Sequence, residues 1–210
     1  MPVVKVCGLT NLEDARLAWE LGAAALGFVF HAESPRAITV SQAIHIRAEL
    51  PPEAVCVGVF VDRNPSEIQS VAEAVGLSAV QLHGRETPET VARLNLPVLK
   101  AIRTEDALDE GRLRAFAVAA FLLDASHPTL AGGTGLCADW TLAQRLAQRF
   151  PLILAGGLHP GNVREAFAKV NPRGLDLSSG IEAEPGRKDP QKLRELFQFF
   201  PFDGERLCLF

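Results

Sequence analysis

Two apolar stretches of this sequence each terminate in a side chain that can transfer a proton. Cys7 ends the run 3–7, and Asp124 ends the run 120–124. A thiol can act as a general base once its pKa falls from about 8.5 towards neutrality. A carboxyl group partly buried among apolar walls has the raised pKa that a general acid needs. The pair therefore suggests proton-transfer catalysis, with a small core cysteine and a turn-capping aspartate as the alternative interpretations.

Two runs of small residues suggest a phosphate-binding site. Residues 154–158 read LAGGL and residues 176–180 read DLSSG, and the candidate ligands are Gly156, Gly157, Ser179 and Gly180. Small residues let backbone N–H groups approach an anion closely, and serine hydroxyls add further donors. Two ordinary tight turns are the alternative interpretation.

Arg36 and His83 also follow apolar runs of the sequence. Arg36 could hold a substrate carboxylate through two parallel hydrogen bonds, although from the residues alone a solvated surface arginine is slightly favoured. His83 is a further candidate at the same kind of position, with no role assigned. Asp62 is better explained by its place just before a helix cap.

Two lysines within apolar runs need either a carboxylate partner or a chemical role. Lys5 has the same parity as Cys7, so both side chains should point to the same face of a strand. We expect Lys5 to form an ion pair with Asp176 on the last predicted strand, and Lys100 carries the same ambiguity. A lysine Schiff-base aldolase acting on a phosphosugar, with Lys5 or Lys100 as the amine, is therefore an alternative function.

The elements that must position these residues repeat along the chain. Apolar runs alternate with helical patterns eight times in 210 residues, and the runs are 3–7, 24–30, 54–61, 79–82, 98–102, 120–124, 152–155 and 174–177. Runs that are apolar on both faces are typical of a parallel sheet covered by helices. We predict an α/β fold with a (β/α)8 barrel, whose functional residues gather at the carboxyl ends of the strands. An open doubly wound sheet is the alternative, although it usually stops at about five or six strands.

Capping residues mark the expected helices. Residues 10–13 (TNLE) have the pattern of a capping box, and Asn64 with Pro65 opens a helix that Gly76 ends. Further helices are expected over roughly 106–116, from about Asp139, after Pro160 and from Asp189.

The composition is that of a soluble globular protein, with 48% hydrophobic and 22% charged residues. We expect one domain over residues 1–210. The net charge of −4 without a Lys/Arg run argues against a nucleic-acid partner. No apolar stretch reaches about 18 residues, so no membrane span is expected, and the first residues lack a signal-peptide pattern. The four widely spaced cysteines form no CxxC pair, which suggests neither a zinc site nor disulfides and fits a reducing cytoplasm.

Nine short runs occur in order along nearly the whole chain: KVCGLT (5–10), GFVF (27–30), SPR (34–36), VGVF (57–60), QLHG (81–84), LD (123–124), GGTG (132–135), LAGGL (154–158) and DLSSGIE (176–182). Together they resemble the phosphoribosylanthranilate isomerase family of tryptophan biosynthesis. No single run is decisive, and the specificity lies in the ordered set.

The resemblance implies a (β/α)8 fold and an Amadori rearrangement of N-(5-phosphoribosyl)anthranilate that needs no cofactor and no metal. It assigns Cys7 as general base, Asp124 as general acid and Arg36 to the anthranilate carboxylate, which overturns the surface interpretation of Arg36. It places the phosphate on Gly156, Gly157, Ser179 and Gly180. The expected partner is a small phosphoribosyl substrate rather than nucleic acid or membrane, and a monomer and a homodimer are both left open.

Two segments depart from the family pattern. Residues 136–138 (LCA) stand where family members often carry a basic and an aromatic residue, just after the glycine-rich run 132–135, which could form a lid over the substrate. The tail 201–210 has no counterpart in the pattern. A non-catalytic protein that binds a phosphate ligand without turning it over is a further alternative.

Overall fold

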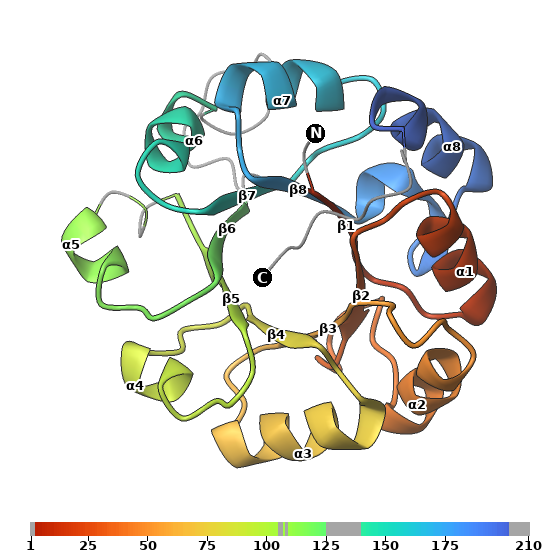
Figure 1. The fold of residues 1–210 in the computed structure, drawn as a ribbon, viewed down its shortest axis with the longest axis horizontal. Coiled ribbons are helices and arrows are strands. Elements are labelled where there is room, and N and C mark those ends of the chain that lie inside the picture. Colours follow the sequence, from red (N-terminus) through yellow and green to blue (C-terminus); the bar gives the residue numbers. More distant parts are fainter. Residues whose placement is uncertain (1–2, 105–106, 108, 125–139, 202–210) are drawn as a thin grey trace.

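Eight parallel strands close into a barrel in the order β1 to β8, and helices surround it (Figure 1). The computed structural model describes residues 3–104, 107, 109–124 and 140–201 of the chain. The barrel strands are β1 (Val3–Val6), β2 (Ala25–Val29), β3 (Cys56–Phe60), β4 (Ala79–Leu82), β5 (Val98–Ile102), β6 (Ala120–Asp124), β7 (Leu152–Ala155) and β8 (Gly174–Leu177). The helices are α1 (Leu12–Glu20), α2 (Val40–Ala48), α3 (Pro65–Val75), α4 (Pro88–Val91), α5 (Glu110–Leu113), α6 (Trp140–Ala147), α7 (Val163–Val170) and α8 (Pro190–Phe199).

Closure of the barrel rests on β1, which pairs in parallel with β2 on one side and with β8 on the other. In the second pairing, Lys5 lies opposite Asp176. The (β/α)8 prediction is therefore confirmed, and the open-sheet alternative is wrong, because an open sheet leaves its two edge strands unpaired.

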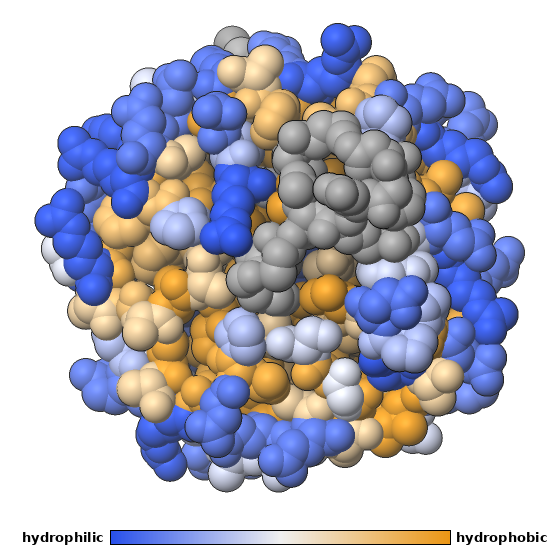
Figure 2. All heavy atoms as spheres, viewed as in Figure 1, coloured by the Kyte–Doolittle hydropathy of each residue, from blue (hydrophilic) through white to orange (hydrophobic). Residues whose placement is uncertain are grey.

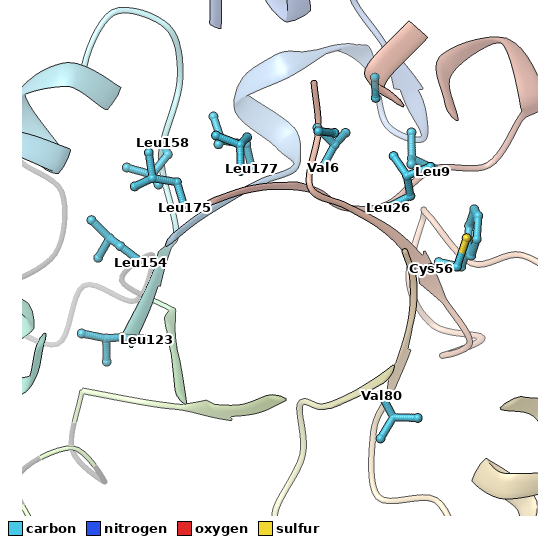
Figure 3. Packing of buried hydrophobic residues seen from close by; sticks show 14 of the residues in the cluster. Val6, Leu9, Leu26, Cys56, Val80, Leu123, Leu154, Leu158, Leu175 and Leu177 are labelled. Atoms are coloured by element: carbon cyan, nitrogen blue, oxygen red, sulfur yellow. The ribbon is translucent and has the colours of Figure 1, made fainter. Parts of the chain in front are cut away.

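Hydrophobic side chains fill two layers, one between strands and helices and one inside the barrel. Labelled side chains of the outer layer, among them Val6, Leu26 and Leu154, point away from the ring of strands (Figure 3). Because strand side chains alternate, Lys5 and Cys7 point inward on either side of Val6. Figure 2 shows hydrophilic residues crowding the periphery, with hydrophobic residues mainly inside that ring.

Several helix boundaries follow the expected caps. Pro65 begins α3, and Gly76 ends it with a φ of 75°, a left-handed conformation that glycine adopts without a Cβ penalty. Asn64 occupies the N-cap position of α3, but its side chain makes no capping hydrogen bond. Asp189 caps α8 as expected, through hydrogen bonds from two backbone N–H groups.

Other boundaries differ from the prediction. The N-cap of α1 is Asn11 rather than Thr10, because the Thr10 hydroxyl donates instead to the carbonyl of Gly186. The helix expected over 106–116 is only the short α5, capped by Asp109. A complete capping box, formed by Thr39 and Gln42, opens α2 and was not predicted.

The chain after β8 contains elements that the sequence did not reveal. A short 3-10 helix, η2 (Ser179–Ile181), leads into an antiparallel pair of strands, β9 (Glu182–Glu184) and β10 (Arg187–Lys188). None of the helices in the described ranges combines the length and the apolar character that a membrane-spanning segment needs. The expected lid 132–135, the departing segment 136–138, the helix start near Asp139 and nearly all of the tail lie outside the described residues.

Candidate active site

One cavity of about 370 Å³ opens where the barrel strands end at their carboxyl termini. Its wall includes seven of the eight residues that the sequence proposed for the active site: Cys7, Arg36, His83, Asp124, Gly156, Gly157 and Ser179. Gly180, the eighth, is adjacent to Ser179. The structure thus brings the predicted residues together around a space large enough for a small organic molecule.

Cys7 directly follows β1, and its backbone N–H donates to the carbonyl of Leu177 on β8 at 2.9 Å. Room for its thiol depends on Gly27 of the neighbouring strand β2. A Cβ added at Gly27 would lie 2.8 Å from Cys7 Sγ, closer than real Cβ atoms approach, and 3.0 Å from Cys7 Cα. The position of the thiol is therefore fixed by the adjacent glycine as well as by its own strand.

Burial raises the pKa of the Cys7 thiol, because desolvation disfavours the thiolate. The Lys5 ammonium opposes this effect, while the Asp176 carboxylate adds to it. The pKa therefore moves away from neutrality in this structure, opposite to the fall that a general base requires. A thiolate at Cys7 would need additional positive charge in the cavity.

Lys5 forms the expected ion pair, with its Nζ donating to Asp176 Oδ1 at 2.8 Å. Burial lowers the pKa of Lys5, but the charges of Asp176 and Cys7 outweigh burial and leave the pKa raised. Lys100 is also paired, because its Nζ donates to Glu86 Oε2 at 3.0 Å and to the Gly84 carbonyl at 2.8 Å. Both lysines are thus paired with buried carboxylates.

Asp124 ends β6, and its carboxylate reaches the cavity beside His83. Asp124 Oδ2 lies 3.6 Å from His83 Nε2, and about a third of each side chain is exposed. On its other edge, His83 Nδ1 lies 2.9 Å from Gln81 Nε2. The side chains of Gln81, His83 and Asp124 therefore form a row along the cavity wall, from β4 to β6.

Arg36 binds the carboxylate of Glu182 in the bidentate geometry that was expected for a substrate carboxylate. Its Nε donates to Glu182 Oε1 at 2.8 Å and its Nη2 to Glu182 Oε2 at 2.7 Å. Lys188 Nζ donates to the same Oε1 at 2.9 Å. Burial would raise the pKa of Glu182, but the hydrogen bonds from Arg36 and Lys188 lower it overall.

Two cationic side chains share the one carboxylate, so the formal charges of Arg36, Lys188 and Glu182 sum to +1, while burial lowers the pKa of Lys188. The Nη1 of Arg36 makes no hydrogen bond to the described part of the chain. This combination of net positive charge and an available guanidinium edge suits a second, incoming carboxylate.

The turns after β7 and β8 form the remaining wall. Gly156 and Gly157 have φ angles of 85° and 66°, which residues with a Cβ rarely adopt. A Cβ at Gly180 would lie only 2.0 Å from the carbonyl oxygen of Leu158, so glycine lets the two turns pack against each other. Two closely packed turns of small residues expose backbone to the cavity, which is the requirement for phosphate binding in a barrel of this kind.

Three buried residues of the site were missed by sequence reasoning as functional residues: Gln81, Glu182 and Lys188. Glu182 and Lys188 lie on β9 and β10, strands that were not predicted. Gln81 could have been noticed as a polar side chain at an inward-facing position of an apolar strand.

Comparisons with known proteins agree with this arrangement. Residues 4–199 match the family model for N-(5'phosphoribosyl)anthranilate (PRA) isomerase. Relatives named N-(5'-phosphoribosyl)anthranilate isomerase include that of Geobacter sulfurreducens, 49% identical over 93% of this chain and 96% of its own, and that of Geobacter metallireducens, 47% identical over the same shares.

Solved structures show the same similarity. Phosphoribosyl anthranilate isomerase from Thermotoga maritima has a TM-score of 0.85 and 42% identity, over 94% of this chain and 98% of that chain. A structure of phosphoribosyl anthranilate isomerase in complex with reduced 1-(o-carboxyphenylamino)-1-deoxyribulose 5-phosphate has a TM-score of 0.83 and 41% identity, over 94% and 97% of the two chains. This chain therefore belongs to the N-(5'-phosphoribosyl)anthranilate isomerase family.

Proposed function

We propose that this chain converts N-(5'-phosphoribosyl)anthranilate into 1-(2-carboxyphenylamino)-1-deoxyribulose 5-phosphate, an aldose-ketose isomerisation of tryptophan biosynthesis. The family match over residues 4–199, the names of the relatives and the reduced product bound by a solved neighbour support it. The observation that carries the residue assignments is that Cys7 and Asp124 both line one cavity. In keeping with the sequence, we place the reaction in the cytoplasm and treat residues 1–210 as one domain.

Binding of the two charged ends orients the substrate. The phosphate would lie on the turns containing Gly156, Gly157, Ser179 and Gly180. The anthranilate carboxylate would pair with Arg36, whose partner Glu182 holds the guanidinium in place. Fixing both ends holds the ribose between the acid and the base, and this orientation lowers the entropic part of the barrier.

Asp124, in its protonated form, would act first as the general acid. It donates its proton to the ribose ring oxygen while the bond between that oxygen and C1′ breaks. The lone pair of the anthranilate nitrogen forms the new double bond to C1′, which gives a protonated imine and leaves Asp124 as a carboxylate.

Cys7, as the thiolate, would then remove the proton from C2′. The electron pair of that C–H bond moves towards the positive imine nitrogen and forms an enolamine, which gains a proton at C1′ and loses one from its C2′ hydroxyl to give the ketone. The imine cation adds positive charge near a thiol whose pKa is otherwise raised by burial, and so favours the thiolate when it is needed. Each positioned acid or base typically contributes about 10²–10⁴ in rate.

The direct test is turnover of freshly prepared N-(5'-phosphoribosyl)anthranilate, followed by loss of its fluorescence. Purified protein should accelerate the decay in buffer without added metal. Binding of the substrate with no acceleration would reject the proposal and favour the non-catalytic alternative.

A further inference from the structure

Gln81 is a polar residue in a place that ordinarily takes an apolar one. It lies on β4 inside the barrel, is 1% exposed, and faces the cavity beside His83. Its neighbours in register on β3 and β5 are Val59 and Leu99. A buried amide in such a layer costs free energy unless its polar atoms are paired.

Only one end of this amide is paired. Nε2 lies 2.9 Å from His83 Nδ1, whereas Oε1 is buried and has no hydrogen-bond partner among the described residues. A core that leaves an amide oxygen unpaired is less stable than one with an apolar residue at that position. Among the described residues, the contact with His83 is therefore the hydrogen bond that accounts for a glutamine here.

An amide nitrogen donates hydrogen bonds and does not accept them. His83 Nδ1 must then accept, so the neutral imidazole carries its proton on Nε2. This Nε2 is the atom that lies 3.6 Å from Asp124 Oδ2. We propose that Gln81 is a positioning residue, which holds His83 as the Nε2–H tautomer so that its N–H faces the carboxyl group of Asp124.

The consequence for the reaction rests on the proposed function, in which Asp124 gives up a proton. Negative charge develops on the carboxylate as the proton moves to the ribose ring oxygen. A neutral N–H that faces Oδ2 stabilises this charge, and the stabilisation grows along the reaction coordinate. The opposite tautomer would present the lone pair of Nε2 to the same oxygen and would disfavour the transfer.

If the Gln81 amide were rotated by 180°, Oε1 would face His83 Nδ1 and the imidazole proton would have to lie on Nδ1. The hydrogen bond between the two side chains would then run in the opposite direction. The two arrangements predict different spectra. We therefore propose ¹⁵N NMR of the ring nitrogens in histidine-labelled protein, with the His83 signals among the five histidines assigned by their loss in His83→Asn. A proton on Nε2 supports the proposal, and a proton on Nδ1 overturns it.

Two substitutions of similar size then test the effect on catalysis. In Gln81→Glu, the carboxylate accepts from Nδ1 and draws the proton to that nitrogen, so kcat should fall about tenfold or more with KM changed by less than about twofold. In Gln81→Leu, the released imidazole still populates the Nε2–H form, so kcat should fall less than in Gln81→Glu. Leu99→Met, a conservative change at the paired position of β5, is the matched control for disturbance of this layer.

The ranking of kcat distinguishes positioning from packing. Wild type above Gln81→Leu above Gln81→Glu, together with a His83 ring in Gln81→Glu that is protonated on Nδ1 and not on Nε2, supports the proposal. Wild-type kcat in a Gln81→Glu protein whose His83 carries a proton on Nδ1 and none on Nε2 overturns it. An Nε2–H signal in a wild type that does not turn over substrate would support the tautomer assignment and reject the proposed function instead, so the two failures are distinguishable.

Discussion

Arg36 and Glu182, which are 146 positions apart in the sequence, are joined by two parallel hydrogen bonds of 2.8 and 2.7 Å. The pair ties the loop after β2 to β9, which follows β8. Lys188 on β10 binds the same carboxylate. The guanidinium is therefore held in one orientation at the cavity wall, with little freedom left to lose when a ligand binds.

Glu182→Gln should weaken substrate binding more than it slows the chemical steps. The amide cannot accept two charge-assisted hydrogen bonds from Arg36, so the guanidinium loses its fixed orientation. We expect KM to rise about tenfold with kcat within about twofold, measured by the fluorescence assay. Glu184→Gln, on the exposed face of the same hairpin, is the control. An unchanged KM in folded Glu182→Gln protein would show that this pair does not prepare the binding site.

Gly27→Ala should displace the Cys7 thiol. The added Cβ would come within 2.8 Å of Sγ, and either the thiol or the β2 backbone must shift. We expect kcat to fall about 10²-fold and the free energy of unfolding to fall by about 1–3 kcal/mol. Gly111→Ala, where the nearest atom is the Asp109 carboxylate oxygen at 3.3 Å, should leave kcat unchanged. Wild-type kcat in Gly27→Ala would mean that the thiol position is not critical.

The barrel could be predicted from the sequence because its signals are local and repeated. Apolar runs and caps such as Pro65 and Gly76 determine each element without reference to distant residues. Because side chains alternate along a strand, Lys5 and Cys7 were expected on the same face of β1. The pairing of β1 with β8, which closes the barrel, then places Asp176 beside Lys5 as its partner.

The parts that could not be predicted depend on contacts between distant segments. Nothing local distinguishes Thr10 from Asn11 as the cap of α1, because the choice depends on Gly186 at the far end of the chain. The Arg36–Glu182 pair has the same origin. The raised pKa of Cys7 also follows from burial by the completed barrel, which the residue type alone does not reveal.

The stability of the protein should fall at alkaline pH through Cys56, a buried thiol on β3. Burial raises its pKa to about 11, against a weaker opposing effect of Arg47. The unfolded thiol ionises near pH 8.5, so the stabilising contribution is complete below that pH and is lost as the pH rises towards 11, by about 3 kcal/mol in total.

Urea unfolding of wild type and Cys56→Ala at pH 8 and pH 10.5 measures this contribution. The pKa of Cys7 is also raised by burial, so Cys7 contributes to the loss of stability in both proteins. The informative quantity is therefore the difference between the two proteins in how much the free energy of unfolding changes from pH 8 to pH 10.5. Cys56→Ala should lose less stability than wild type over this interval. Equal losses would show that Cys56 does not contribute to the alkaline destabilisation.

Borohydride should trap no covalent adduct on this protein in the presence of substrate. A Schiff base needs a free amine, whereas the amines of Lys5 and Lys100 are buried and paired with the carboxylates of Asp176 and Glu86. Intact-protein and peptide mass spectrometry after reduction should give the unmodified mass. An adduct on either lysine would restore the aldolase alternative.

The most direct test of the acid–base pair is kcat for Cys7→Ala and Asp124→Asn, measured by the fluorescence assay beside Cys56→Ala as a buried-cysteine control. We expect each of the first two variants to lose about 10²–10⁴ in kcat with little change in KM, while Cys56→Ala keeps wild-type kcat. Wild-type turnover by either Cys7→Ala or Asp124→Asn would contradict the assignment of Cys7 as the base or Asp124 as the acid.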